Sequence, residues 1–235
     1  MKNRLLKFTA VFCALCIIGS AALCVKARKS VIKTGLTDMT TTDAALLASA
    51  HIQESCVLTA NDETRYISSL EAAYDQNIEQ LDSVDTILVV EATGDLCQYR
   101  SSLEQRATVV DVIRCPEKLK PGDEIRIFRL MGFIYENGIA YCHSENIMYP
   151  GSRYLIFMNS SSLNAYTGSR DYNVGYWEMN YFKLDRSSAY NVCPSYDFAA
   201  CKDVVHFTSS DEIAAAISEY EECVIERFYG RKTEG

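Results

Sequence analysis

Residues 86–92 read TILVVEA, a run of β-branched and other apolar side chains that is typical of a buried β-strand. Gly94-Asp95 predicts a turn directly after this run, followed by another strand from Leu96 to Arg100. Similar strand-like runs occur at residues 107–114, 124–129, 153–158 and within 176–184, and turn residues precede two of them at 121–123 and 150–151. Short strands joined by tight turns predict an antiparallel barrel or sandwich rather than a parallel α/β sheet.

A hairpin is predicted in the middle of this region. Phe133-Ile134-Tyr135 and Ile139-Ala140-Tyr141 flank Glu136-Asn137-Gly138. Asn-Gly tolerates the positive φ angles of a tight primed turn, so the two short runs are expected to pair in antiparallel fashion.

Helices are expected before and after the strands. A tether and a short helix, within Asp43–Ser55, occupy residues 26–60. An amphipathic helix follows over 61–83, because apolar residues recur at spacings of three and four. The last helix covers 209–229, where Ser209 and Glu212 form a capping-box pattern. Residues 84–208 are then one β domain, and the fold class is mainly β with flanking helices (α+β).

Four stretches of this β domain carry a resemblance to a known family. They are DTILVVEA at 85–92, TVVDVI at 108–113, PGDEIRI at 121–127 and PGSRYLIFM at 150–158. In this order they resemble the netrin/tissue-inhibitor-of-metalloproteinases-like (NTR-like) module, an OB-type β-barrel found also in secreted bacterial proteins, over about residues 84–184. Family members that inhibit proteases bind the protease zinc through a mature N-terminal Cys-x-Cys, and no such motif follows residue 25 here. The resemblance therefore implies an OB-like barrel with a binding role, and not protease inhibition.

The N-terminal 25 residues predict export. Lys2, Arg4 and Lys7 precede an uncharged apolar run over residues 8–25. This run fits a retained membrane anchor, and it also fits a signal peptide that is cleaved after Ala22. The expected location is therefore the cell membrane, as a single-pass protein with its body outside the cytoplasm, or the exterior after cleavage near Ala22.

Charge limits the class of ligand. The whole chain carries a net charge of −8, and beyond residue 25 there are 20 basic against 31 acidic residues. An acidic body is unsuited to nucleic acid, because nucleic-acid binding requires basic patches that neutralise phosphate. The expected partner is a protein or another component of the cell envelope, and the membrane is contacted through the N-terminal segment.

Seven cysteines lie beyond the apolar segment, an odd number for an oxidising compartment. Cys193 and Cys201 bracket a short loop that contains proline, so they are the first candidates for a disulfide. No zinc-binding spacing occurs among these cysteines, and neither a metal nor a cofactor is expected.

Aromatic and titratable residues give the remaining functional candidates. The segment 166–198 is rich in tyrosine, and Tyr172, Tyr176 and Trp177 are its expected exposed, ligand-binding members. The three histidines are expected in a helix (His51), beside the hairpin (His143) and before the last helix (His206). They form no assembled catalytic set, and no catalytic residue is assigned. The sequence therefore favours a non-enzymatic binding or assembly module outside the cytoplasm. An extracytoplasmic hydrolase with dispersed Asp, Glu, His and Cys residues, and binding of cell-wall glycan by the aromatic segment, are the two alternatives.

Overall fold

The computed structural model describes residues 36–37, 50–99, 102–130, 133–136, 139–142, 145–163, 170–174, 180–185, 192–193, 195–201 and 204–230. The chain divides into two units, residues 1–37 and 38–235. The described element of the first unit is β1 (Leu36–Thr37).

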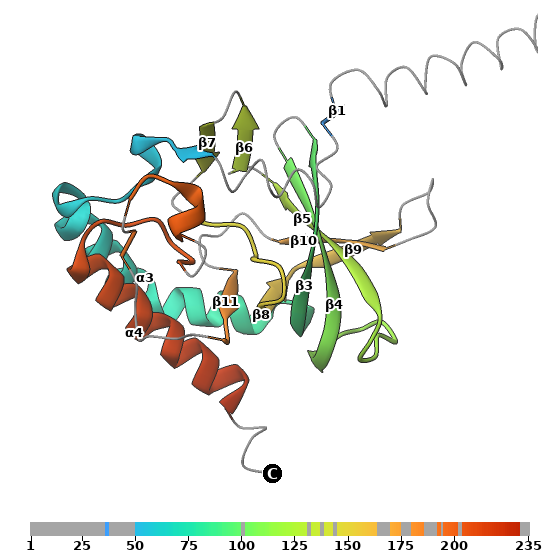
Figure 1. The fold of residues 1–235 in the computed structure, drawn as a ribbon. Coiled ribbons are helices and arrows are strands. Elements are labelled where there is room, and N and C mark those ends of the chain that lie inside the picture. Colours follow the sequence, from blue (N-terminus) through green and yellow to red (C-terminus); the bar gives the residue numbers. More distant parts are fainter. Residues whose placement is uncertain are drawn as a thin grey trace, which may run out of the picture. The chain divides into compact units, whose positions relative to one another are not determined.

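A curled sheet, which forms a half-barrel, dominates the second unit (Figure 1). Its strands are β3 (Thr86–Tyr99), β4 (Ser102–Arg114), β5 (Glu124–Leu130), β8 (Arg153–Met158), β9 (Ser160–Leu163), β10 (Arg170–Val174) and β11 (Tyr181–Lys183). They are ordered β11-β8-β3-β4-β5-β10-β9. Neighbours run antiparallel except β5 and β10, which are parallel. With two long helices beside it, this half-barrel confirms the α+β class.

The sheet curls because its ends are linked in the sequence. Strand β8 lies near one end of the strand order and β9 lies at the other, yet Asn159 alone separates them in the chain. A flat sheet would hold these two strands several strand spacings of about 4.8 Å apart, farther than one residue reaches.

Strand β3 differs from the expected strand-turn-strand. It continues through Gly94-Asp95, and the register against β4 shifts between Ala92 and Leu96. Gly94 has φ +94°, so it forms a bulge within one long strand. The segment that was expected to turn therefore bends the sheet instead.

We expect Gly94→Ala to lower the free energy of unfolding by about 1–2 kcal/mol, more than Gly122→Ala does. Both glycines have positive φ, but an added Cβ at Gly94 would lie 3.1 Å from Pro150 Cγ, whereas Gly122 has no neighbour within 4 Å. Urea unfolding of the two variants separates backbone strain from this contact. Equal losses of unfolding free energy in the two variants would show that Pro150 moves away from the added Cβ without measurable cost.

A second, three-stranded sheet contains β2 (His51–Ile52), β7 (Ile139–Cys142) and β6 (Phe133–Glu136), in that order. The antiparallel pairing of β6 and β7 confirms the predicted hairpin. The hairpin belongs to this small sheet and not to the half-barrel. The expected helix over 43–55 is wrong in its described part, because residues 51–52 form β2 and residues 54–55 belong to the short 3₁₀ helix η1 (Glu54–Cys56).

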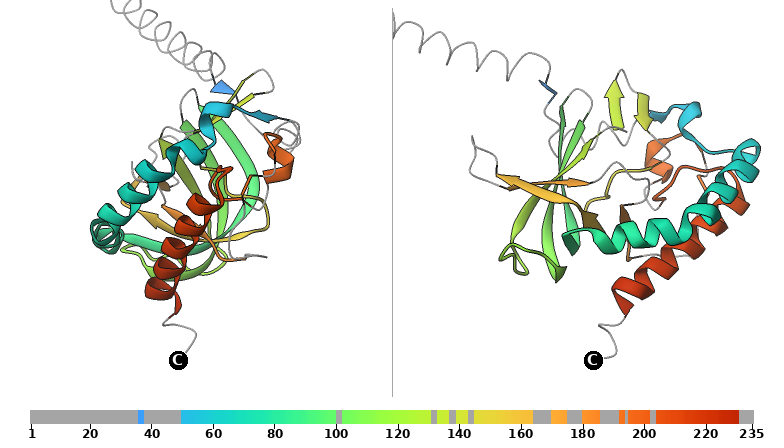
Figure 2. Two further views of the ribbon diagram at one scale, coloured as in Figure 1. Left: turned by 90° about the vertical axis from the view of Figure 1, so that its left-hand side faces the viewer. Right: turned by 180° about the vertical axis from the view of Figure 1, so that it is seen from behind.

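Two α-helices lie side by side against the half-barrel (Figures 1 and 2). Helix α3 (Glu63–Ser83) follows the 3₁₀ helix η2 (Ala60–Asp62), and α4 (Asp211–Phe228) ends the described chain together with residues 229–230. Ser210, not the expected Ser209, caps α4, and its hydroxyl accepts a hydrogen bond from Ile213 N. A capping box that the sequence did not reveal joins Thr59 and Asp62 before α3.

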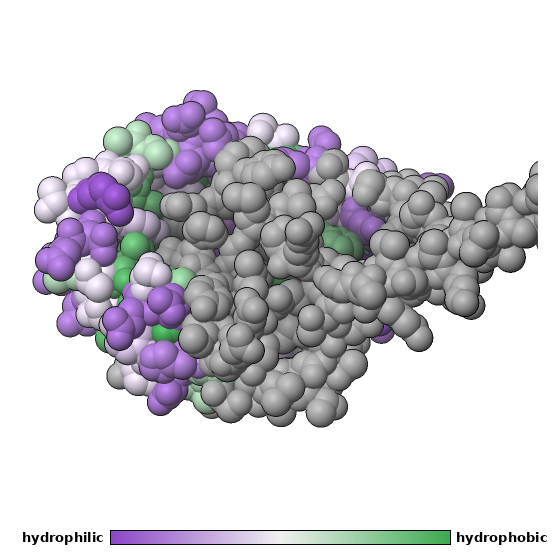
Figure 3. Space-filling view, turned by 90° about the horizontal axis from the view of Figure 1, so that it is seen from above, coloured by the Kyte–Doolittle hydropathy of each residue, from purple (hydrophilic) through white to green (hydrophobic). Residues whose placement is uncertain are grey.

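The described residues of the second unit form three apolar clusters. One fills the half-barrel, one lies between β3, β8, β11 and the two helices, and one lies beneath β2 and the 3₁₀ helix η3 (Phe198–Cys201). The last cluster joins segments far apart in sequence, because Ile52 and Val57 lie in it together with Phe207. Beside it, Leu58 N donates to Phe207 O (2.9 Å), and Ser209 N donates to Leu58 O (2.8 Å). The surface seen from above is mostly hydrophilic where it is described, with small hydrophobic patches (Figure 3).

Within the described residues, neither helix has the length and apolar character needed to cross a membrane. The apolar run over residues 8–25 lies outside the described residues.

Candidate ligand-binding groove

Helix α3 buries its apolar stripe unevenly along its length. Ile78 and Leu81, near its C-terminal end, are buried. Leu70 and Tyr74, one to two turns earlier, are only half-buried although they pack against the apolar cluster beneath the two helices. The N-terminal half of α3 therefore leaves apolar surface beside α4 that nothing in the described chain covers completely.

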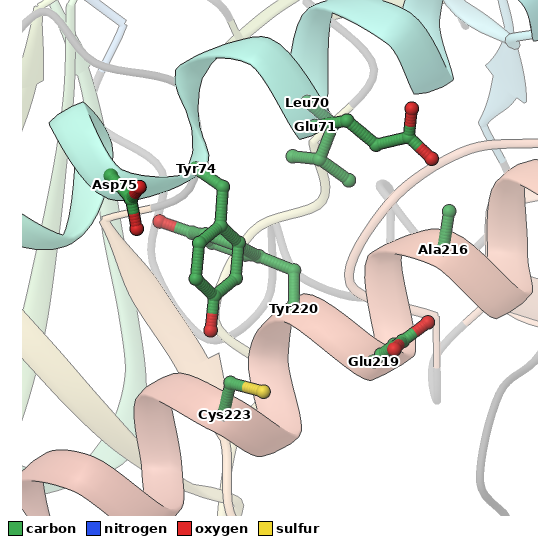
Figure 4. A pocket seen from close by; sticks show the side chains of 8 residues that line it. All are labelled: Leu70, Glu71, Tyr74, Asp75, Ala216, Glu219, Tyr220 and Cys223. Atoms are coloured by element: carbon green, nitrogen blue, oxygen red, sulfur yellow. The ribbon is translucent and has the colours of Figure 1, made fainter.

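A groove of 370 Å³ occupies this place between α3 and α4. Figure 4 shows the side chains that line it, which are Leu70, Glu71, Tyr74 and Asp75 from α3 and Ala216, Glu219, Tyr220 and Cys223 from α4. This volume lies within the usual range of sites for small ligands or single side chains. Each helix contributes four residues because they recur at spacings of three and four and so share one helix face.

Two tyrosines form the centre of the groove. The rings of Tyr74 and Tyr220 meet edge to face, with centroids 5.6 Å apart and planes at 85°. Tyr220 is buried and braces the floor, whereas Tyr74 is half-buried and points its hydroxyl toward Cys223 (Figure 4). Burial, and to a smaller extent the nearby Tyr74, raises the pKa of Tyr220 above its usual value. The groove thus offers a rigid aromatic surface.

The rim of the groove is acidic. Glu71 and Asp75 on α3 and Glu219 on α4 are all exposed. None of the described residues that line the groove is lysine or arginine. Arg227, in the last turn of α4, lies over the Phe228 ring and 3.9 Å from Asp82. The negative charges of the rim carboxylates therefore have no positively charged counterpart among the lining residues.

Tyr74 reports on the groove through its ionisation. Its hydrogen bond with Cys223, together with burial and the electrostatic effects of Cys223 and Asp75, outweighs the nearby Arg227 and raises the pKa of Tyr74 to about 12 from 10.0. The unfolded chain loses this proton near pH 10 while the folded chain keeps it, so folding stability falls as the pH rises from 10 to 12.

We expect the free energy of unfolding to fall less steeply between pH 10 and 12 in Tyr74→Phe than in the unmodified protein. Urea unfolding at stepped pH measures this difference, and Tyr196→Phe, at a half-buried position outside the groove, is the control. Identical slopes for Tyr74→Phe and the unmodified protein would contradict the Tyr74–Cys223 hydrogen bond.

Of the three residues in the predicted aromatic site, the structure describes Tyr172. Tyr172 was expected to be exposed, which is wrong: it is only 1% exposed and lies inside the half-barrel on β10. Strand β10 pairs with β5 on one edge and with β9 on the other. Alternate side chains of a strand point to opposite faces of the sheet, and Tyr172 lies on the face that lines the half-barrel. Tyr176 and Trp177 lie outside the described residues.

The predicted disulfide is present. Cys193 and Cys201 are joined, with Cα atoms 5.8 Å apart, a normal separation for a disulfide. Among the described cysteines, Cys56, Cys115 and Cys223 are not in disulfides.

The histidines do not share a site in the described part of the chain. His51 lies on β2 and not in a helix, and its Nδ1 is 3.8 Å from Asp197 Oδ1. His206 is buried, with Nε2 3.6 Å from Oε1 of the buried Glu221 on α4. His143 lies outside the described residues.

A polar cluster around Glu117 lies outside the groove. Its carboxylate accepts hydrogen bonds from Ser161 Oγ, from Tyr172 OH (3.3 Å) and from Cys115 Sγ (3.2 Å). Burial, followed by the hydrogen bond to Glu117, raises the pKa of the Cys115 thiol. A raised pKa disfavours the thiolate that a nucleophile requires. The hydrogen bonds to Glu117 connect the segment after β4 with strands β9 and β10.

The described residues contain no group of three or more side chains that could hold a metal ion. The chain matches no protein-family model and no curated protein. The groove is therefore the feature on which a functional interpretation rests. The sequence predicted the two helices, over 61–83 and 209–229, but not that they pack side by side, and so it could not predict a groove between them.

Proposed function

We propose that this protein is a non-enzymatic binding module and that its ligand occupies the groove between α3 and α4. The groove itself carries the proposal: it has an aromatic floor formed by Tyr220 and Tyr74, apolar walls at Leu70 and Ala216, and a polar rim. Sites that bind ligands typically combine a mostly apolar concave surface with a few polar groups that orient the ligand.

We further propose that the half-barrel is an OB-type barrel related to the NTR-like module. Two features support this. Strand β10 pairs in parallel with β5, and β9, at one end of the strand order, follows β8, near the other end, directly in the chain. The sheet therefore curls toward a closed barrel. In this proposal the barrel is a scaffold, and the two helices packed on it supply the binding surface.

The location that we propose is outside the cytoplasm. The apolar run over residues 8–25, preceded by three basic residues, supports either a tether to the membrane or export with cleavage near Ala22. In both cases the groove would meet partners in the cell envelope or beyond it.

Site-specific photo-crosslinking tests the groove as the binding site. The photoreactive residue p-benzoylphenylalanine replaces Ala216, which lines the groove, or Ala215, which is exposed on the same helix but lies outside the groove. We expect an adduct in native membranes from position 216 and not from position 215. The same adducts from both positions, or none from 216 in a folded protein, would overturn the assignment.

A further inference from the structure

We infer that the ligand of the groove is a cationic peptide segment of a partner protein, in which a lysine or arginine stands next to an apolar residue. This inference rests on the proposed function and specifies the partner of the same site. Three features of the groove support it, namely its charge, its floor and its size.

Charge is the first feature. Glu71, Asp75 and Glu219 place three carboxylates around one opening, two from α3 and one from α4. A cationic side chain that enters between them can contact carboxylates on both helices, whereas phosphate, anionic lipid or an acidic peptide would be repelled. The acidic balance of the whole chain extends this preference to longer range.

The floor is the second feature. Lysine and arginine carry an apolar stem below the charged group, and this stem can lie along Leu70 and Ala216. The half-buried Tyr74 ring then offers its face to the cation, a contact that strengthens as water is excluded. Carboxylates alone would attract any cation, but an aromatic and apolar floor beneath them selects a side chain with a hydrophobic stem.

Size is the third feature. A volume of 370 Å³ accommodates one long side chain with a neighbouring apolar residue, and it is too small for a folded domain. The groove follows the line where two helices meet, so a peptide can lie along it and place successive side chains against it. We therefore assign the cation to a peptide and not to a free amine.

The test measures peptide binding to the full chain in detergent micelles by fluorescence anisotropy. The probe is a short fluorescein-labelled peptide of alternating leucine and lysine, and matched peptides replace every lysine by glutamine or by glutamate. The groove variant combines Glu71→Gln, Asp75→Asn and Glu219→Gln. Its control combines Glu79→Gln, Glu222→Gln and Glu226→Gln, which remove the same charge from exposed positions on the same helices outside the groove.

We expect the lysine peptide to bind and the glutamate peptide not to bind. Exposed ion pairs are individually weak, so the three substitutions together should weaken binding by about tenfold, and the control by no more than about twofold. Circular dichroism confirms that both variants fold. Binding should also weaken as salt is raised from 50 to 300 mM.

Three results would overturn the inference. Equal weakening by both triple variants would mean that the peptide responds to net charge and not to the groove. Competition by spermidine as strong as by the unlabelled lysine peptide would identify a free polyamine as the ligand. No lysine-peptide binding, while the Ala216 position still crosslinks specifically, would reject a cationic ligand and leave the groove as the binding site.

Discussion

Phe157→Ala is expected to lower the free energy of unfolding by about 3–5 kcal/mol. Phe157 lies on β8, is only 1% exposed and packs edge to face on two other rings. Its ring centroid is 5.6 Å from that of Phe182 on β11 and 5.0 Å from that of Phe228 on α4. Removing it opens a cavity where the sheet meets the end of α4, and the surrounding rings cannot collapse to fill it fully.

Phe128→Ala is the matched control. Phe128 lies on β5, is half-buried and sits beneath the Arg126 guanidinium at 5.8 Å, so the same truncation there should cost only about 1 kcal/mol. Urea unfolding monitored by circular dichroism gives both values. A Phe157→Ala loss no larger than that of Phe128→Ala would mean that α4 is not seated on the sheet through this ring.

Asn146→Asp is expected to destabilise the protein by about 3 kcal/mol or more, although it changes only one atom of the side chain. The Asn146 amide donates to Cys201 O and to Val204 O, both at 2.8 Å, and its Oδ1 accepts from Ile147 N at 2.8 Å. The side chain is 1% exposed. A carboxylate in its place has no hydrogens to donate, so two buried carbonyl groups would face a negative charge.

The control is Asn61→Asp, at an exposed position just before α3, where a negative charge favours the helix N-terminus. Thermal unfolding of the two variants at neutral pH compares them directly. If Asn146→Asp unfolds at the temperature of the unmodified protein, the buried amide bridge that the structure shows is not formed in solution.

Sequence patterns predicted those elements that are determined by residues close together in the chain. The run at 86–92, the hairpin around Asn137-Gly138 and the two long helices each carry a local period or a turn that neighbouring residues determine. The Cys193–Cys201 pair was predictable for the same reason, because the two cysteines lie only eight residues apart.

Other features depend on residues distant in sequence, and local patterns could not reveal them. Strand β9 is the polar run Ser160–Leu163, which resembles a loop until β10 pairs with it. Asn146 resembles any polar residue after a hairpin, since its partners lie 55 and 58 residues later. The groove was missed in the same way, because α3 and α4 are separated by the whole half-barrel in sequence.

The contacts between Leu58 and residues 207–209 can form only late in synthesis, because the two segments are far apart in the chain. The Leu58 carbonyl accepts from the Thr208 hydroxyl across a separation of 150 residues. At a translation rate of about 5–20 residues per second, roughly 8–30 seconds pass between the two segments. During that interval Ile52 and Val57 have no access to Phe207, with which they share an apolar cluster. A nascent chain that stalls before residue 204 therefore leaves the apolar residues around Ile52 and Val57 exposed. Chaperones and proteases recognise such surface in an incomplete protein.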